Sequence, residues 1–244
     1  MNVTQYNFSI IYSSSNGNGS VIERTNSTTI TDLEAGTNYT ISVTTIVSGD
    51  VKSEAVVINQ FTIPSKPGAI TVTSFTNSSI SLSLGKPTGM NVTQCNFSII
   101  YSSSNGNGSV IERTNSTTIT DLEAGTNYTI SVTTIVSGDV KSEAVVINQF
   151  TKPNPVTNVR VLNQNTTSVT LSWDRPIDHK LGYSYRVETR GDPPSDHIVV
   201  EDTITVAQLN PGTRYAFSVF TLAPDRTPAD SVNVSHTTAC QFSQ

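Results

Sequence analysis

Residues 122–132 read Leu-Glu-Ala-Gly-Thr-Asn-Tyr-Thr-Ile-Ser-Val, and the same pattern occurs three times in the chain. The copy at residues 33–43 is identical, and the copy at residues 209–219 reads Leu-Asn-Pro-Gly-Thr-Arg-Tyr-Ala-Phe-Ser-Val. Each copy joins a glycine turn to an alternation of apolar and polar or small side chains, which is typical of a half-buried β-strand. We expect the tyrosine ring to fill the edge of a core and its hydroxyl to bond back to a carbonyl group of the preceding corner.

The three tyrosines, Tyr39, Tyr128 and Tyr215, are spaced by 89 and then 87 residues. This spacing fits β-sandwich domains of roughly 100 residues or slightly fewer. The sequence therefore predicts three units followed by a tail. Unit one is a partial domain at residues 1–62, unit two covers 66–151, unit three covers 153–238, and the tail is 239–244.

Units one and two are near copies of each other. Residues 1–62 and 90–151 are identical except that Tyr6 corresponds to Cys95. Residues 67–89 are expected to supply the first two strands of unit two, and unit one has no counterpart to them. We therefore expect unit one to hold only strands C to G and to be poorly folded. Because Met1 corresponds to the internal residue Met90 and no leader-like segment follows it, we also expect a fragment of a longer chain.

The alternating apolar positions predict seven strands in unit two, at residues 70–72, 80–84, 97–101, 110–111, 118–119, 128–134 and 144–149. Between the third and fourth of these, residues 102–109 are predicted as a turn, and its Asn105-Gly106 pair tolerates the positive φ that a tight hairpin requires. In unit three the same alternation places Val169, Leu171 and Trp173 on strand B, and Tyr185 and Val187 on strand C.

Unit three resembles the fibronectin type III family most clearly. The resemblance rests on Trp173 at the end of strand B, Tyr185 in strand C, and the corner Leu209-x-Pro-Gly-Thr-x-Tyr215. It implies an all-β fold of tandem, immunoglobulin-like, seven-stranded Greek-key sandwiches, the first one truncated, with Tyr39, Tyr128, Trp173 and Tyr215 as structural residues. Unit two departs from the pattern because Leu84 stands where unit three has Trp173.

The composition argues against several kinds of partner. The net charge is -5, only 14% of residues are charged, and in no unit do Lys and Arg outnumber Asp and Glu. A nucleic-acid groove or an anionic-membrane patch needs clustered cations, so neither is expected. The two cysteines, Cys95 and Cys240, lie in a strand and in the tail, which excludes a disulfide scaffold and a Cys-x-x-Cys metal site.

Sequons of the form Asn-x-Ser/Thr are about twice as frequent as chance predicts, which favours passage through the secretory pathway. An accidental excess on an Asn/Ser/Thr-rich β surface is the alternative. The predicted glycosylation sites are Asn2, Asn7, Asn18, Asn26, Asn38, Asn77, Asn91, Asn96, Asn107, Asn115, Asn127, Asn165 and Asn233.

Catalytic patterns are not found in the sequence. The three histidines, His179, His197 and His236, fit solvated positions of unit three, and neither Gly-x-Ser-x-Gly nor His-Glu-x-x-His occurs. We therefore expect that this stretch of sequence is not an enzyme, and that it has no cofactor, no metal and no small-molecule substrate. The tripeptide Arg190-Gly191-Asp192 resembles the integrin-binding motif, although it lies between strands C and C′, and a plain solvated turn is the alternative.

The leading interpretation is an extracellular spacer and protein-binding surface. Ser/Thr/Asn-rich repeats, the Gly-Thr-x-Tyr corner and the linker Thr-Lys-Pro-Asn-Pro-Val at residues 151–156 resemble receptor-type tyrosine phosphatases with long fibronectin arrays. That resemblance implies the outer part of a plasma-membrane glycoprotein, whose partner is an unidentified cell-surface or matrix protein. The alternatives are a matrix adhesion protein that binds integrin through Arg190-Gly191-Asp192, and a cytokine-receptor-like module, which the lack of Trp-Ser-x-Trp-Ser disfavours.

Overall fold

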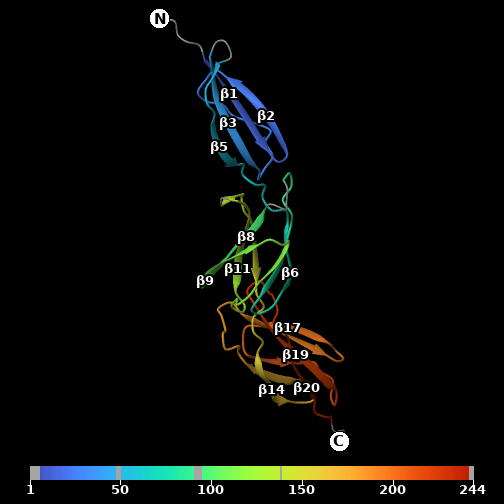
Figure 1. Ribbon diagram of the computed structural model, residues 1–244. Helices are drawn as coiled ribbons and strands as arrows, with labels where there is room; N and C mark the ends of the chain where they lie inside the picture. Colours follow the sequence, from blue (N-terminus) through green and yellow to red (C-terminus); the bar gives the residue numbers. More distant parts are fainter. Residues whose placement is uncertain (1–5, 48–50, 91–94, 138, 242–244) are drawn as a thin grey trace.

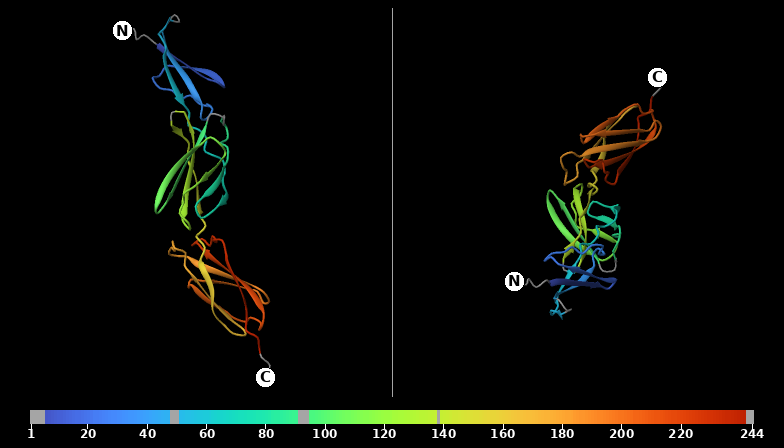
Figure 2. Two further views of the ribbon diagram at one scale, coloured as in Figure 1. Left: turned by 60° about the horizontal axis from the view of Figure 1, so that its bottom comes forward. Right: turned by 90° about the horizontal axis from the view of Figure 1, so that it is seen from above.

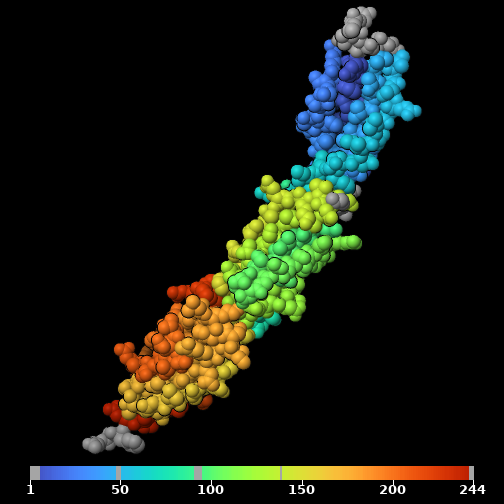
Figure 3. Space-filling model, turned by 90° about the vertical axis from the view of Figure 1, so that its left-hand side faces the viewer, coloured from blue at the N-terminus to red at the C-terminus, as the bar shows by residue number. Residues whose placement is uncertain are grey.

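The computed structural model describes residues 6–47, 51–90, 95–137 and 139–241. Within these residues all regular structure is β-strand, as expected, and the three units lie one after another in an elongated row (Figure 1). Unit one and unit three occupy opposite ends, and two further views show the same order (Figure 2). The space-filling view shows a narrow rod with unit two at its middle (Figure 3).

Unit two is a sandwich of two antiparallel sheets. One sheet has the order β10-β7-β6, and the other has the order β12-β11-β8-β9 with β13 also paired to β11. The strands are β6 (Ile70–Phe75), β7 (Ile80–Leu84), β8 (Asn96–Ser103), β9 (Gly106–Glu112), β10 (Ser116–Ile119), β11 (Asn127–Val136), β12 (Val140–Lys141) and β13 (Val145–Phe150). The seven predicted strands are present in this order, and β12 is an additional short strand.

The core of unit two follows the predicted alternation. Ile80, Leu82 and Leu84 of β7 pack with Ile99 of β8 and Val132 of β11 in one buried cluster. The side chains between them point outward, which is the period-two pattern of a strand with one buried face.

The hairpin between β8 and β9 differs from the prediction for residues 102–109. Ser103 pairs directly with Gly106, so the turn consists only of Ser104 and Asn105. Neither Asn105 nor Gly106 has a positive φ, so the expectation that a tight hairpin requires one at this pair is wrong here. The strands extend farther because Gly108 lies opposite Tyr101, where a Cβ atom would lie 2.3 Å from the tyrosine hydroxyl.

Unit three repeats the sandwich with sheets β14-β15-β18 and β17-β16-β19-β20. Its buried cluster includes Trp173, Tyr185 and Tyr215, and the rings of Trp173 and Tyr185 meet edge to face at 5.4 Å. The strands are β14 (Thr157–Gln164), β15 (Val169–Asp174), β16 (Ser184–Arg190), β17 (Ser195–Val199), β18 (Thr203–Val206), β19 (Arg214–Leu222) and β20 (Val232–Thr237).

Unit one differs from the other two because its described strands form a single sheet. The order is β2-β1-β3-β4, with β5 also paired to β3. The strands are β1 (Tyr6–Ser14), β2 (Gly17–Glu23), β3 (Asn38–Val47), β4 (Val51–Lys52) and β5 (Val56–Phe61). Among these residues no second sheet lies over Phe8, Ile10, Ile41 and Val43, in agreement with the sequence. That unit one is poorly folded stays a prediction.

The three corner tyrosines are buried as predicted, but the direction of their hydrogen bonds is not the expected one. The hydroxyl of Tyr128 accepts the backbone N–H of Glu123 at 2.9 Å, and Tyr39 and Tyr215 accept equivalent N–H groups. The prediction that each hydroxyl bonds a carbonyl group of its own corner is therefore wrong. The acceptor role satisfies an N–H group that the glycine turn leaves without a ladder partner.

Candidate functional site

The contact between units two and three is centred on Lys180, in the loop between β15 and β16. Its Nζ donates to the carbonyl oxygen of Ala124 at 2.8 Å and to the hydroxyl of Thr126, both in the glycine corner of unit two. Nζ also lies 3.5 Å from the carboxylate of Glu123. The ammonium group thereby satisfies a carbonyl oxygen of that corner, so this lysine attaches unit three to unit two.

The pKa of Glu123 lies below its usual value. The main cause is the hydrogen bond that Asn105 donates to its carboxylate at 2.7 Å, and Lys180 adds a favourable charge. Because the carboxylate is solvent-exposed, this ion pair contributes little to stability and mainly orients Lys180.

Tyr183 makes the apolar part of the same contact. Its ring is buried, and a Cβ atom on Gly125 would lie 1.8 Å from its hydroxyl oxygen, so only glycine fits at that corner. Burial, with a smaller contribution from Asp178, raises the pKa of Tyr183 to about 12. Gly36 has the corresponding role in unit one, where Met90 and Val136 of unit two lie against it. In units one and two, the glycine corner that precedes the tyrosine-containing strand therefore also forms the junction with the following unit.

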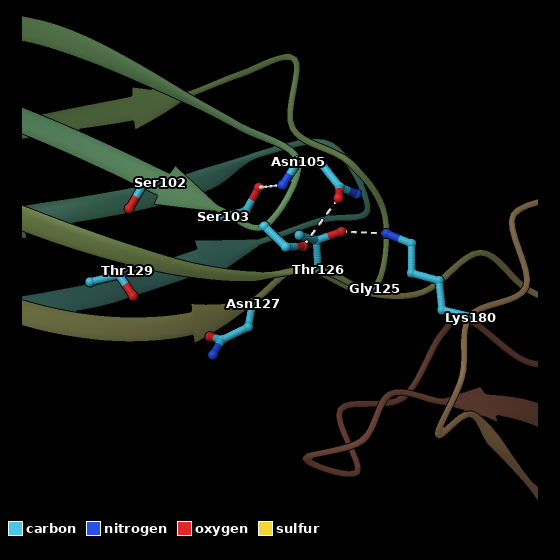
Figure 4. Close-up of a pocket in the computed structure, with 9 residues that line it drawn as sticks. Ser102, Ser103, Asn105, Gly125, Thr126, Asn127, Thr129 and Lys180 are labelled. Carbon is cyan, nitrogen blue, oxygen red and sulfur yellow. Dashed lines mark hydrogen bonds between the residues drawn. The ribbon is translucent and has the colours of Figure 1, made fainter.

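Two hollows flank Lys180. One has a volume of about 420 Å³ and is lined by the tip of the β8–β9 hairpin, the glycine corner and Lys180 (Figure 4). The other, of about 620 Å³, is lined by Leu122, Glu123, Asn154 and His179 among others. In Figure 4 Lys180 extends from unit three across the gap toward Thr126. Both hollows are open and are lined mostly by polar or charged residue types, which suits a protein surface better than a small-molecule site.

The loop that carries Lys180 also has two fully exposed apolar side chains. Ile177 and Leu181, on the same loop as Lys180, are 102% and 98% exposed. Apolar side chains without any cover are a feature of protein-contact sites when they lie close together. The sequence carried no recognisable signal for this loop, because its residues become a surface feature only through the contact with unit two.

The Arg190-Gly191-Asp192 turn connects β16 and β17 at the surface of unit three, and all three residues are exposed. The carbonyl oxygen of Asp192 accepts hydrogen bonds from the Tyr215 hydroxyl and from the Asn210 side chain. Gly191 has φ of +153°, and a Cβ atom there would lie 2.4 Å from the Tyr215 ring. Packing against Tyr215 therefore requires glycine at this position, independently of any ligand.

Most predicted glycosylation sites lie at the surface. Asn7 and Asn96 are half-buried, and Asn2 and Asn91 lie outside the described residues. The exposed sites are Asn18, Asn26, Asn38, Asn77, Asn107, Asn115, Asn127, Asn165 and Asn233. Asn77 differs from the other exposed sites because its amide donates to Asn154 at 2.8 Å near the junction of units two and three.

In the described part of the chain, no group of three or more His, Cys, Asp or Glu side chains is placed so that it could hold a metal ion. The histidines are dispersed: His179 lies in the β15–β16 loop, His197 in β17 and His236 in β20. Within the same residues, no helix is long and apolar enough to cross a membrane.

Comparisons with known proteins agree with the architecture. The fibronectin type III domain family matches residues 65–148 and 154–234. The chain is 31% identical over 212 residues to human receptor-type tyrosine-protein phosphatase H, covering 84% of this chain and 19% of that protein. It is 33% identical over 215 residues to chicken receptor-type tyrosine-protein phosphatase eta, covering 84% and 15%.

Matrix proteins are also among the relatives. Chicken Tenascin-R is 25% identical over 197 residues, covering 78% of this chain and 14% of that protein. A solved two-domain fibronectin type III segment from chicken tenascin is 22% identical, with a TM-score of 0.48, and covers 71% of this chain and 99% of that structure.

The chain spans about a fifth or less of the length of these curated relatives. The matched residues include Trp173 and the tyrosine corners of units two and three, on which the sandwiches depend. The chain belongs to the fibronectin type III family.

Proposed function

We propose that this chain is a non-catalytic, extracellular fibronectin type III segment that acts as a spacer and protein-binding surface in a receptor-type tyrosine phosphatase. The observation that carries the proposal is similarity to two such phosphatases over 84% of the chain, at 31% and 33% identity. The contacts of Lys180 and Tyr183 with the corner of unit two support the spacer role, because they hold consecutive units in an extended row.

The location can be tested on intact cells that express the parent protein. An antibody raised against residues 153–238 should label unpermeabilised cells, and protease added outside should remove the label. Labelling that appears only after permeabilisation would contradict the proposal.

The proposed protein-binding surface is the loop that carries Ile177, Lys180 and Leu181. An Fc fusion of the whole chain should bind cells that display the partner, and replacing Ile177 and Leu181 together by serine should reduce that binding at least fivefold. Ile198→Ser is the matched control, because Ile198 is also an exposed aliphatic residue of unit three but lies on β17. Equal loss in both variants would place the binding surface elsewhere.

Glycosylation of the exposed sequons forms part of the same proposal. Asn165 and Asn233 lie in sequence that occurs once, so their peptides can be assigned without ambiguity. Release of glycans from the secreted chain by peptide N-glycosidase in heavy-oxygen water should convert both residues to labelled aspartate. An unmodified secreted chain would contradict this part of the proposal.

Integrin binding through Arg190-Gly191-Asp192 is the second candidate. The observation in its favour is that both charged side chains are exposed while the backbone of Asp192 is held by Tyr215 and Asn210. Cells should attach to surfaces coated with the chain, and Asp192→Ala should abolish attachment, whereas Asp196→Ala on the same hairpin should not. Unchanged attachment with Asp192→Ala would exclude the motif.

A further inference from the structure

The larger of the two hollows beside Lys180 lies between units two and three. Its volume is about 620 Å³, and both units contribute to its lining. Unit two supplies residues 77–78 and 122–124, the linker supplies Asn154, and residues 178–180 come from the β15–β16 loop of unit three. Small ligands occupy sites of roughly 300–1,000 Å³, so this hollow is large enough for a sugar.

Asn77, one of the predicted glycosylation sites, lines this hollow. It lies in the β6–β7 turn, which is closed by a bond from the Thr76 N–H to the Ser79 carbonyl oxygen at 2.9 Å. The Ser78 carbonyl oxygen accepts the N–H of Leu122 at 3.0 Å, which fixes the turn to the glycine corner. Because the Asn77 side chain is exposed, a glycan attached to it would start from a fixed point at the edge of the hollow.

The amide of Asn77 already reaches the linker. Its Nδ2 donates to the Oδ1 of Asn154 at 2.8 Å. During N-glycosylation, Nδ2 forms a bond to the anomeric carbon of a sugar carried on a lipid pyrophosphate, the pyrophosphate leaves with the bonding electrons, and Nδ2 loses one of its two protons. The other proton remains, so a glycosylated Asn77 can still donate to Asn154.

The wall that unit three contributes offers polar groups to a sugar. Asp178 lines the hollow, and one of its carboxylate oxygens is buried without a hydrogen-bond partner among the described residues. Such an oxygen is costly, and rotation about the terminal torsion of the side chain can turn the carboxylate toward a donor in the hollow. The ring of His179, which packs edge to face against Tyr183 at 5.5 Å, belongs to the same wall. Sugar hydroxyl and acetamido N–H groups are donors of the required kind.

Building on the proposed extracellular function, we propose that the N-linked glycan of Asn77 occupies this hollow and connects units two and three. Its first sugars lie against Leu122 and donate to the carboxylate of Asp178. An open, polar hollow holds a free sugar only weakly, but a covalent tether keeps the local sugar concentration on the order of millimolar. The glycan is then a third connection between the units, beside Lys180 and Tyr183.

The experiment compares two sequons that lie in equivalent turns. Asn165 is in the β14–β15 turn, where its N–H donates to the Ser168 carbonyl oxygen, but its own carbonyl oxygen accepts the N–H of Ala239 in the tail. The secreted full chain is treated with peptide N-glycosidase in heavy-oxygen water, and release at each site is followed by mass spectrometry. In the native chain, release at Asn77 should be at least tenfold slower than at Asn165. After heat denaturation the two rates should agree within twofold.

The wall of unit three is tested by substitution. Asp178→Ala combined with His179→Ala should bring native release at Asn77 to within twofold of the reference site. The matched control is the other Asp-His pair of unit three, on β17. Asp196→Ala combined with His197→Ala should leave the slow release unchanged.

Two results would overturn this inference and leave the proposed function intact. They are glycans at Asn165 and Asn233 but none at Asn77, and equal release at Asn77 and Asn165 in the native chain. Slow release that persists with Asp178→Ala and His179→Ala would also overturn it, because unit three would then not hold the glycan. A secreted chain without glycans at any of the three sites would contradict the proposed glycosylation and this inference together.

Discussion

Tyr215→Phe is expected to destabilise unit three by about 2 kcal/mol. The hydroxyl is buried, accepts the N–H of Asn210 at 2.9 Å and donates to the carbonyl oxygen of Asp192. Each hydrogen bond of this kind contributes about 1 kcal/mol net, and its loss leaves the Asn210 N–H without a partner. The carbonyl of Asp192 keeps the bond from the Asn210 side chain, so its share of the loss is smaller.

Trp173 makes this measurement specific to one unit. It is the only tryptophan of the chain and lies in the core of unit three, so its fluorescence follows the unfolding of that unit within the full-length chain. With a urea dependence of about 1 kcal/mol per M for a domain of this size, the midpoint should fall by about 2 M.

The corresponding change in unit two is the control. Among the described residues, the Tyr128 hydroxyl has one hydrogen-bond partner, the Glu123 N–H. Tyr128→Phe should therefore destabilise unit two by about 1 kcal/mol. It should leave the Trp173 transition in place, because Trp173 belongs to unit three. A Trp173 midpoint that Tyr215→Phe leaves unchanged, or that Tyr128→Phe lowers equally, would refute the assigned role of the corner.

Three further substitutions have defined expected outcomes. Gly125→Ala should destabilise unit two by about 1–2 kcal/mol, because Gly125 has a φ of +55°. The added Cβ atom should also displace Tyr183, so that residual dipolar couplings of units two and three no longer fit one orientation. Tyr183→Phe should leave stability at pH 7 unchanged or up to about 1 kcal/mol higher, because it removes a buried hydroxyl that has no hydrogen-bond partner. The pKa of Tyr183 is raised to about 12 in the folded chain, so unit three should keep its full stability below pH 10. Between pH 10 and 12 it should lose on the order of 2–3 kcal/mol, because the unfolded chain then releases the tyrosine proton more readily. Tyr183→Phe should remove that loss, as measured by urea titrations followed by the fluorescence of Trp173. Leu84→Ala should cost unit two about 2–5 kcal/mol, measured by differential scanning calorimetry, because Leu84 is buried in its core; an unchanged heat-absorption profile would contradict this.

Much of the fold was predictable because period-two alternation is a local property. The alternation of Ile80, Leu82 and Leu84 indicates which face of the strand is buried, whichever element packs against that face. The repeated glycine corner likewise placed the buried tyrosines and the order of the units. A tight hairpin was predicted within residues 102–109, but its bounds were not, because they depend on the pairing that places Gly108 opposite Tyr101 on the partner strand.

The functional surfaces were less predictable, because they join residues that are distant in sequence. Lys180 is 54 residues from Thr126, and Tyr215 is 23 residues from Asp192. Nothing in the neighbourhood of Lys180 or Tyr183 distinguishes them from ordinary loop residues. Their roles arise because the fold places this loop of unit three against the glycine corner of unit two.

Residues 27–30 and 116–119 separate the two kinds of information most clearly. Both read Ser-Thr-Thr-Ile, so every local preference is the same, yet only the second copy is a strand. Local alternation specified which side chains face a core and where the corners fall. Whether a core exists around them was decided by tertiary pairing, because an extended segment leaves its backbone hydrogen-bonding groups to water until another strand, here β7, lies beside it.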